Sequence, residues 1–271
     1  MDDPTIHRHI YLSPHLDDAA LSCGGTIHAQ CRRGLEVRVI TLFAGSPPES
    51  SPTEYAEELR TRWGGASDPV AERRREDQLA MAHLGASVEH WAWCDCVYRI
   101  DPATATSLYP TEVSIFEAVH PLEASLHIEL ARMLADRVPP SGALLYAPLG
   151  VGHHVDHQIV HRASRLLSEQ GYRVLYYEDC PYAGDRQAVE QALARCDAAA
   201  WQMHVAQLDD ANLENKCQAI AAYQSQISTF WQDDYEMRRF VRDQSRDAQG
   251  HFVERYWQLT APCGPTEVNA E

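Results

Sequence analysis

The sequence predicts an α/β fold of three layers, with a mostly parallel sheet and helices on both faces. The first observation is a strand, a helix and a second strand within about 40 residues, which is typical of a right-handed βαβ unit. The second is an arrangement that occurs twice: a strand, a short turn dense in His and Asp, and then a helix. Together they favour a Rossmann-like architecture.

The predicted elements follow in order along the chain. The strands are apolar and rich in β-branched residues, and lie at 9–12, 36–45, 88–93, 143–149 and 172–179. The helices lie between them at 18–34, 70–86, 122–138 and within 150–171. The helix over 122–138 has Leu126, Leu130 and Leu134 at helical spacing, and in the helix over 70–86 we expect Leu79, Ala82 and Leu84 near the apolar side.

Two segments differ from this alternation. Residues 45–69 are polar and rich in Pro, Ser and Gly, and such long connections are often mobile loops or lids. Residues 185–271 form a C-terminal part that we expect to be largely helical, with 201–208 and 252–259 as edge strands. At 271 residues the chain can enclose one core, so we expect a single domain over 1–271.

The charge balance limits the partners. The chain has 23 basic and 39 acidic residues, a formal net charge of -16, which repels nucleic acid and anionic membranes and favours a neutral or cationic small substrate. There is no apolar stretch near the roughly 20 residues of a membrane span and no readable secretory signal, so we expect a cytoplasmic protein with reduced cysteines. The oligomeric state is not readable from the sequence.

Two polar clusters follow predicted strands. Because ligands bind outside the carboxyl ends of parallel strands, both clusters should lie at one edge of the sheet. Imidazole and carboxylate together suit zinc or ferrous iron better than magnesium or calcium, and three protein ligands with an open position mark a catalytic site. The clusters contain these residues: His15, Asp17, Asp18; and His153, His154, Asp156, His157, His161.

Two other patterns are interpreted as structural. Cys94 and Cys96 form a lone CxC without a second pair, which favours ordinary buried thiols over a structural metal site. Gly24 and Gly25 belong to no GxGxxG following a strand, so a dinucleotide fingerprint is absent.

The two clusters carry a family resemblance. PHLDD (14–18) and HHVDH (153–157) resemble the PHxDD and HxDH motifs of the LmbE-like or PIG-L family of metal-dependent N-acetylglucosamine deacetylases. Three further segments, RRREDQLAMAHLG (73–85), WCDCVYR (93–99) and KCQAIAAYQSQ (216–226), are similar to family segments in the same order. One position departs, because Ala19 stands where the first motif often has Glu.

The resemblance implies an activity: removal of acetyl from an N-acetylglucosamine-type amino sugar, free or conjugated, with Zn²⁺ as cofactor and Fe²⁺ as the alternative. A metal-activated water would attack the amide carbonyl while a carboxylate takes its proton. The implied roles are metal ligation by His15, Asp18 and His157; general base, Asp17; oxyanion stabiliser or acid, His154, oriented by Asp156; and sugar contacts, Arg73 and Asp95.

Other interpretations stay open at this point. Asp17 and Asp18 could simply cap the following helix, and Arg99 fits a surface salt bridge as well as a substrate contact. Two histidines and a carboxylate also make the site of a non-haem Fe(II) oxygenase, although that class usually has an all-β fold. A third alternative is a non-catalytic binding member of the same fold. His153 and His161 have no family role, and a place beside the ligands or at the surface is expected for both.

Overall fold

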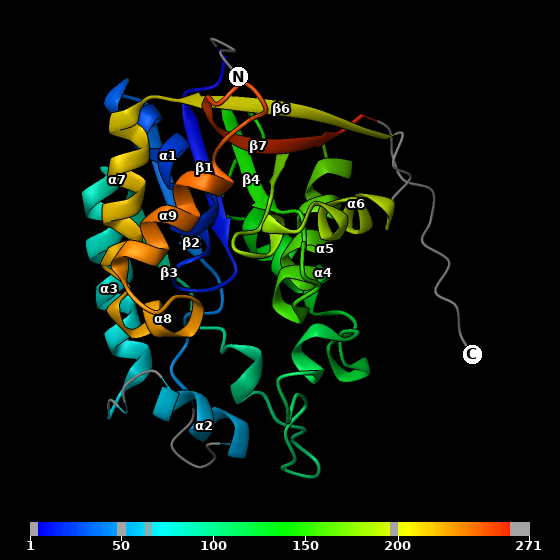
Figure 1. The fold of residues 1–271 in the computed structure, drawn as a ribbon. Coiled ribbons are helices and arrows are strands. Elements are labelled where there is room, and N and C mark those ends of the chain that lie inside the picture. Colours follow the sequence, from blue (N-terminus) through cyan, green and yellow to red (C-terminus); the bar gives the residue numbers. More distant parts are fainter. Residues whose placement is uncertain (1–4, 48–52, 63–64, 66, 196–199, 261–271) are drawn as a thin grey trace.

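The computed structural model describes residues 5–47, 53–62, 65, 67–195 and 200–260. In this part of the chain one sheet has the strand order β3-β2-β1-β4-β5-β7-β6 (Figure 1). The strands are β1 (Arg8–Ser13), β2 (Glu36–Thr41), β3 (Ser87–His90), β4 (Ala143–Pro148), β5 (Arg173–Tyr177), β6 (Trp201–Leu208) and β7 (Phe252–Leu259). The first five are parallel to one another, and β7 pairs antiparallel with both β5 and β6.

Helices cover both faces of the sheet (Figure 1). One face carries α1 (Asp18–Arg32), α3 (Pro69–Leu84) and α7 (Asp210–Ala221), which pack on one another. The other face carries α4 (Leu126–Ala135), α5 (Val155–Glu169) and α6 (Arg186–Ala194). Three further helices are α2 (Glu54–Arg62), α8 (Gln224–Phe230) and α9 (Asp234–Gln244). The predicted three-layer α/β class is confirmed.

Side-chain alternation along the strands separates two cores. Ile10 and Leu12 of β1 pack in the core beneath α4 and α5, whereas Tyr11 between them packs beneath α1 and α3. Successive residues of a strand point to opposite faces, and strands buried on both faces read as continuous apolar runs. This explains why the strand segments were recognisable from composition.

The apolar side expected for α3 is wrong. Leu79 is 65% exposed and Ala82 is also exposed, while Leu84 is buried as predicted. The buried face of α3 instead contains charged residues, among them Arg73, Glu76 and Asp77. The same face also buries the apolar residues Ala80, Met81 and Leu84, so α3 places charged and apolar side chains side by side in the interior.

The segments outside the βα alternation differ in part from expectation. The segment 45–69 contains the helix α2; the mobility expected for it stays a prediction, and residues 48–52, 63–64 and 66 lie outside the described residues. The described residues of the C-terminal part are largely helical, and β6 and β7 have the predicted bounds. However, β7 lies inside the sheet between β5 and β6, so it is not an edge strand. A single domain over 1–271 also stays a prediction.

The strand order places the two His- and Asp-rich turns side by side. β1 and β4 are neighbours, and the helices that follow them, α1 and α5, lie on opposite faces of the sheet. The crevice at such a switch point is where open α/β sheets bind ligands. Among the described residues, no helix combines the length and apolar character needed to cross a membrane.

Candidate metal centre and active site

The turn after β1 is fixed by its own hydrogen bonds. The backbone N–H of His15 donates to Asp18 Oδ2 at 2.8 Å, and the Ser13 hydroxyl donates to the His15 carbonyl at 2.7 Å. Asp17 has φ 155° and ψ -30°, a sparsely populated combination that costs on the order of 1–3 kcal/mol and is found mainly at functional sites. The turn buries both carboxylates and directs them to different partners.

The start of α5 fixes the tautomer of His154. His154 is the N-cap residue, and its Nδ1 accepts the backbone N–H of Asp156 at 3.2 Å. Because Nδ1 accepts, a neutral ring carries its proton on Nε2. Burial, with His15 next in effect, holds the pKa of His154 well below its usual value, which keeps the ring neutral in the metal-free protein. Its Nε2–H is therefore a donor.

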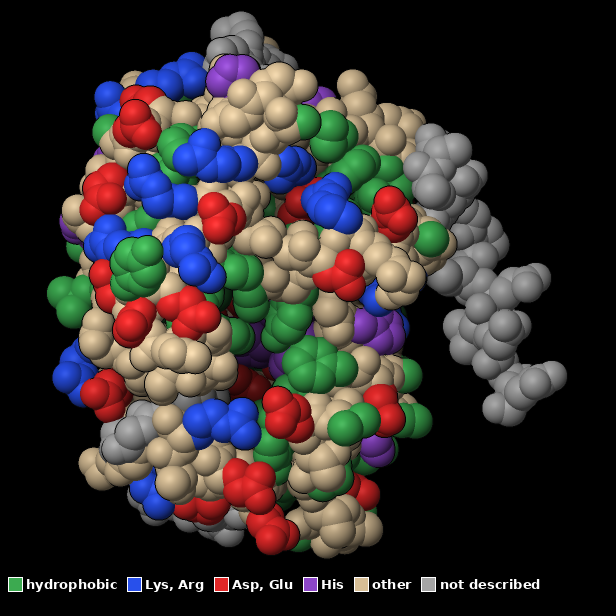
Figure 2. Space-filling model, in the orientation of Figure 1, with side chains coloured by type: hydrophobic (Ala, Val, Ile, Leu, Met, Phe, Trp, Pro, Cys, Tyr) green, Lys and Arg blue, Asp and Glu red, His purple; other side chains and the backbone are tan. Residues whose placement is uncertain are grey.

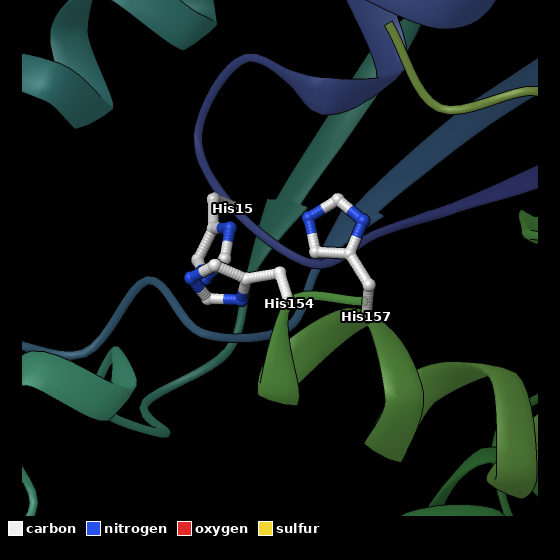
Figure 3. A group of neighbouring side chains, drawn as sticks. All are labelled: His15, His154 and His157. Carbon is white, nitrogen blue, oxygen red and sulfur yellow. The ribbon is translucent and has the colours of Figure 1, made fainter. Parts of the chain in front are cut away.

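The histidines of the two turns converge (Figure 3). Ring nitrogens of His15, His154 and His157 lie within 4.8 Å of one another. Asp18 Oδ2 is 3.3 Å from His15 Nδ1 and also 3.3 Å from His157 Nε2. The three residues predicted as metal ligands are thus brought together. On the face drawn in Figure 2, a hollow opens with histidine and acidic side chains inside it.

The opposite nitrogen of each imidazole has a buried carboxylate partner. His15 Nε2 is 2.9 Å from Asp156 Oδ2, and His157 Nδ1 is 2.7 Å from Asp179 Oδ1. When the rings are neutral, these carboxylates accept the ring proton, which leaves the lone pairs of His15 Nδ1 and His157 Nε2 directed towards Asp18. This carboxylate–histidine arrangement is typical of metal-binding histidines. The donor set therefore fits a divalent transition metal.

The electrostatics of the donor set also suit a cation. Burial lowers the pKa of His157, but Asp18 and then Asp179 outweigh it and raise the pKa to about 10. Burial likewise opposes protonation of His15, yet the surrounding carboxylates, first among them Asp95, raise its pKa well above the usual value. In the metal-free protein, protons on the two imidazoles balance the carboxylates. A bound cation would replace those protons.

Asp17 has a separate environment. Burial raises its pKa to about 7, although the Arg73 guanidinium, 3.6 Å from Asp17 Oδ2, acts in the opposite direction. Asp17 also borders a small cleft whose other side is formed by apolar residues of α8 and its neighbours. A carboxyl group in this setting can exist in either protonation state near neutral pH.

The role expected for Asp156 differs in the structure. Its carboxylate bonds to His15 Nε2 and to the backbone N–H of Cys96 at 3.0 Å, whereas its contact with His154 is through its own backbone N–H. The sequence pattern did not show this, because His154 and Asp156 are close in sequence and His15 is 141 positions away. Asp156 therefore orients His15.

Arg99 belongs to a buried ion network instead of a surface salt bridge. One guanidinium nitrogen bonds to Asp156 Oδ1 at 2.5 Å, and Nε is 2.8 Å from Glu123 Oε1. Tyr109 donates its hydroxyl to Glu123 Oε2 at 2.7 Å. The network holds the Asp156 carboxylate ionised, and the Arg99 charge holds the pKa of Asp156 far below its usual value even though burial opposes this.

The two predicted sugar contacts lie near the centre. Arg73 is 7% exposed, and its guanidinium donates to the Leu16 carbonyl at 3.4 Å. The same guanidinium lies 3.6 Å from Asp17 Oδ2. Asp95 Oδ2 is 3.7 Å from His15 Nε2, and its Oδ1 accepts the Val97 backbone N–H. The positions of Arg73 and Asp95 do not show whether either side chain contacts a substrate, so their roles as sugar contacts stay predictions.

The cysteines of the CxC pattern remain thiols. The six cysteines among the described residues are free. Cys96 Sγ lies 3.9 Å from His154 Nε2, and Cys96, His154 and Asp156 are close enough to hold an ion. However, both oxygens of Asp156 are already bonded, one of them to a guanidinium. This makes that group a poorer cation site than the one at Asp18.

Asp179 is a functional residue that sequence reasoning missed. It follows β5 and, besides His157, accepts the backbone N–H groups of Gly150 and Val151 at 2.8 and 2.9 Å. Its Oδ1 orients the ring of His157 while its Oδ2 holds the loop that leads to α5. The feature that could have indicated Asp179 is its position after β5. That strand is parallel and adjacent to β4, so both strands end at the edge of the sheet where the two turns lie.

The buried charges of α3 were also missed. Asp77 accepts from the Tyr223 hydroxyl at 2.5 Å and from the Thr41 hydroxyl at 3.1 Å. Glu76 accepts from the backbone N–H and hydroxyl of Ser225 at 2.8 and 2.6 Å. Two segments that resemble family motifs, 73–85 and 216–226, thus contact each other, and their hydrogen bonds hold the helix bearing Arg73 against the centre.

Comparison with known protein families identifies the family of this chain. The family profile described as PIG-L, GlcNAc-PI de-N-acetylase, matches residues 10–168, more than half of the 271 residues. The chain belongs to the PIG-L family. The match contains both turns of the metal centre but ends before Asp179 and before the C-terminal strands of this PIG-L protein.

Individual relatives agree with this assignment. The chain is 34% identical over 189 residues to a 2′-N-acetylparomamine deacetylase of Streptomyces fradiae, covering 68% of the chain and 60% of that protein. It is 28% identical over 185 residues to an enzyme of the same name from Niallia circulans, and the match covers 64% of this chain and 66% of that protein. It thus spans less than two thirds of these relatives. The crystal structure of the A40926 pseudoaglycone deacetylase Dbv21 is similar over 95% of this chain and 99% of that one, with 26% identity and a TM-score of 0.72.

Proposed function

We propose that this PIG-L protein is a metal-dependent hydrolase that removes the acetyl group from an N-acetylated amino sugar or its conjugate. The observation that carries the proposal is the position of Asp18 Oδ2, 3.3 Å from a nitrogen of each of His15 and His157, with Asp17 directly beside it. The names of the similar proteins, two 2′-N-acetylparomamine deacetylases and the A40926 pseudoaglycone deacetylase, support the substrate class.

The metal would be held by His15 Nδ1, Asp18 Oδ2 and His157 Nε2. A divalent transition metal bound there supplies Lewis acidity towards the amide carbonyl and brings the pKa of a water towards neutrality. Zn²⁺ is proposed because imidazole and carboxylate suit it, and Fe²⁺ is the alternative that the same donors accept. The carboxylates of Asp156 and Asp179 keep the two rings in the tautomer that this requires.

Asp17 is proposed to move the proton. Its carboxylate takes a proton from the attacking water, holds it, and passes it to the nitrogen of the departing amine as the C–N bond breaks. Burial raises the pKa of Asp17 towards neutrality, which suits a group that must both accept and return a proton. Arg73, 3.6 Å away, keeps the ionised form accessible. Acetate and the free amine are the products.

His154 is proposed to stabilise the oxyanion. Its Nδ1 is engaged by the backbone of α5, so Nε2–H is the donor that can reach the carbonyl oxygen as negative charge develops on it. The ring acts here as a neutral donor, because its low pKa makes an imidazolium unfavourable in the metal-free protein. Loss of such a donor typically costs about 100-fold or more in rate.

The test measures acetate release from N-acetylated sugars. Metal-loaded protein is incubated with N-acetylglucosamine, its inositol glycoside and N-acetylparomamine, with and without a chelator. We expect chelator-sensitive release from at least one of them. Asp17→Asn should lower kcat by about 100- to 10,000-fold while metal content stays at one ion per chain.

A matched control and the contrary outcomes complete this test. Asp210→Asn removes an exposed carboxylate in the first turn of α7 and should leave kcat unchanged. If metal-loaded protein leaves every conjugate intact, or if Asp17→Asn retains full turnover, the proposal fails. Oxygen-dependent turnover would indicate the oxygenase alternative, and metal binding without any turnover would indicate a binding module.

A further inference from the structure

A second cavity lies away from the metal centre, between α4, α5 and α6, the helices on one face of the sheet (Figure 1). Its volume is about 570 Å³, within the roughly 300–1,000 Å³ of small-molecule sites. None of His15, Asp18 and His157 lines it. We call it the arginine cavity, because its basic lining residues are Arg162, Arg165, Arg195, His127, His153 and His161.

We propose that the arginine cavity binds a small molecule carrying a phosphate group, at a site separate from the metal centre. Arginine forks match the oxygens of phosphate in geometry and charge, and three of them face one cavity. Apolar residues, among them Leu149 and Leu166, complete the lining and offer a surface to the body of an organic phosphate. The proposal does not depend on the deacetylase activity.

One face of α5 supplies most of the positive charge. His161, Arg162 and Arg165 are spaced so that they lie on one side of the helix. The opposite side buries Ile159 and Ala163 against the sheet. The arginines are therefore presented outwards from a helix that is itself firmly packed.

The guanidinium groups that line the arginine cavity have no carboxylate within ion-pair distance among the residues that the structure describes. Arg195 donates to the Gly150 carbonyl at 2.8 Å and Arg162 donates to Gln158 Oε1 at 3.3 Å, both neutral acceptors. Arg165 Nε is buried without a hydrogen-bond partner. A buried donor left unpaired costs free energy.

Desolvation acts on these charges as well. Partial burial lowers the pKa of Arg162 and of Arg195, although both residues remain exposed to solvent at the rim of the cavity. The chain has 39 acidic residues against 23 basic ones, so carboxylate partners would be easy to supply. The lining includes one acidic residue, Glu169, and it is exposed and pairs with none of the three arginines. An external anion is the missing partner.

The histidines of the cavity add hydrogen-bonding capacity. His153 Nδ1 donates to the Phe116 carbonyl at 3.1 Å, and His161 Nδ1 donates to the Pro148 carbonyl at 3.0 Å. Because each Nδ1 is a donor, each Nε2 is left as the nitrogen that a ligand can contact. His153 and His154 are neighbours in sequence yet serve different sites. His153 and His161, for which the motifs suggested no role, are therefore part of the lining of the arginine cavity.

The test is calorimetric titration of zinc-loaded protein at constant ionic strength. Inorganic phosphate and glucose 6-phosphate are titrated separately into wild type and Arg162→Gln/Arg165→Gln. We expect saturable binding to wild type and an affinity at least about tenfold weaker in the double variant. Phosphate bound at the metal would be equal in both proteins, so the difference reports the arginine cavity. The tighter of the two ligands distinguishes free phosphate from a phosphate ester.

Arg132→Gln is the matched control, because Arg132 is an exposed arginine of α4 outside the lining. It should change the affinity by less than about twofold. Thermal unfolding without phosphate verifies that the double variant is folded. The proposal is overturned if wild type shows no saturable binding of either phosphate, or if the double variant binds them as tightly as wild type.

Discussion

At the scale of single residues, the candidate metal centre consists of consecutive contacts that cross the crevice. Asp156 orients His15, Asp18 lies between His15 and His157, and Asp179 orients His157. The three central residues were predictable because PHLDD and HHVDH are local patterns. Asp179 was not, because a carboxylate after a strand is informative only when the neighbouring strand is known.

Asp179 gives the prediction at this scale. In Asp179→Asn the side chain keeps its size but loses the charge that holds the Nδ1 proton of His157. We expect the metal affinity to fall about 10- to 100-fold, measured by competition with a chromophoric chelator. Asp210→Asn, an exposed change of the same kind, should leave the affinity unchanged. An Asp179→Asn protein with wild-type affinity would show that Asp179 does not support the metal.

At the scale of elements, α1 is joined to the C-terminal part by a buried ion pair. Lys216 Nζ of α7 is 2.7 Å from Glu254 Oε1 of β7, and the same carboxylate accepts the backbone N–H groups of Gly25 and Thr26. A Cβ at Gly25 would lie 2.5 Å from Leu208 Cδ1 and 3.2 Å from Glu254 Oε1, so a larger residue there would displace these side chains. The sequence did not predict the pair, because Lys216 and Glu254 are 38 positions apart and belong to different elements.

This pair predicts a stability difference. Lys216→Met leaves Glu254 buried without its counterion, so we expect the free energy of unfolding to fall by about 3–5 kcal/mol. Arg238→Met removes two surface ion pairs, with Glu214 and with Asp234, and should cost no more than about 1–2 kcal/mol. Both are measured by denaturant unfolding at neutral pH. Equal effects of the two changes would contradict the importance of burial here.

At the scale of the whole molecule, the sequence predicted the parallel half of the sheet and the crevice between its central strands. The central strands β1, β4 and β5 are buried on both faces and therefore read as apolar runs. It did not predict that β7 would lie between β5 and β6, because that pairing joins segments far apart in sequence. Nor did it predict the charged inner face of α3, whose buried partners, such as Tyr223, come from 216–226.

Metal binding gives the prediction for the molecule as a whole. The proposed ligands come from two distant turns, so a metal that holds both stabilises the native state and not the unfolded chain. At free metal near 100 times Kd, the gain is about 2.7 kcal/mol. Calorimetric unfolding should therefore show a higher midpoint with Zn²⁺ than with chelator, and His157→Ala should lose most of this difference. A wild-type midpoint independent of metal would count against the site.

The two ring nitrogens of His154 have different roles, and this affects how substitutions at this position are interpreted. Nδ1 of His154 caps the N-terminus of α5, whereas Nε2 is the nitrogen proposed to contact the substrate. His154→Ala would therefore remove the helix cap and the proposed oxyanion donor together. A change to asparagine keeps an oxygen able to start the helix. Comparing the two replacements would separate architectural loss from chemical loss at one position.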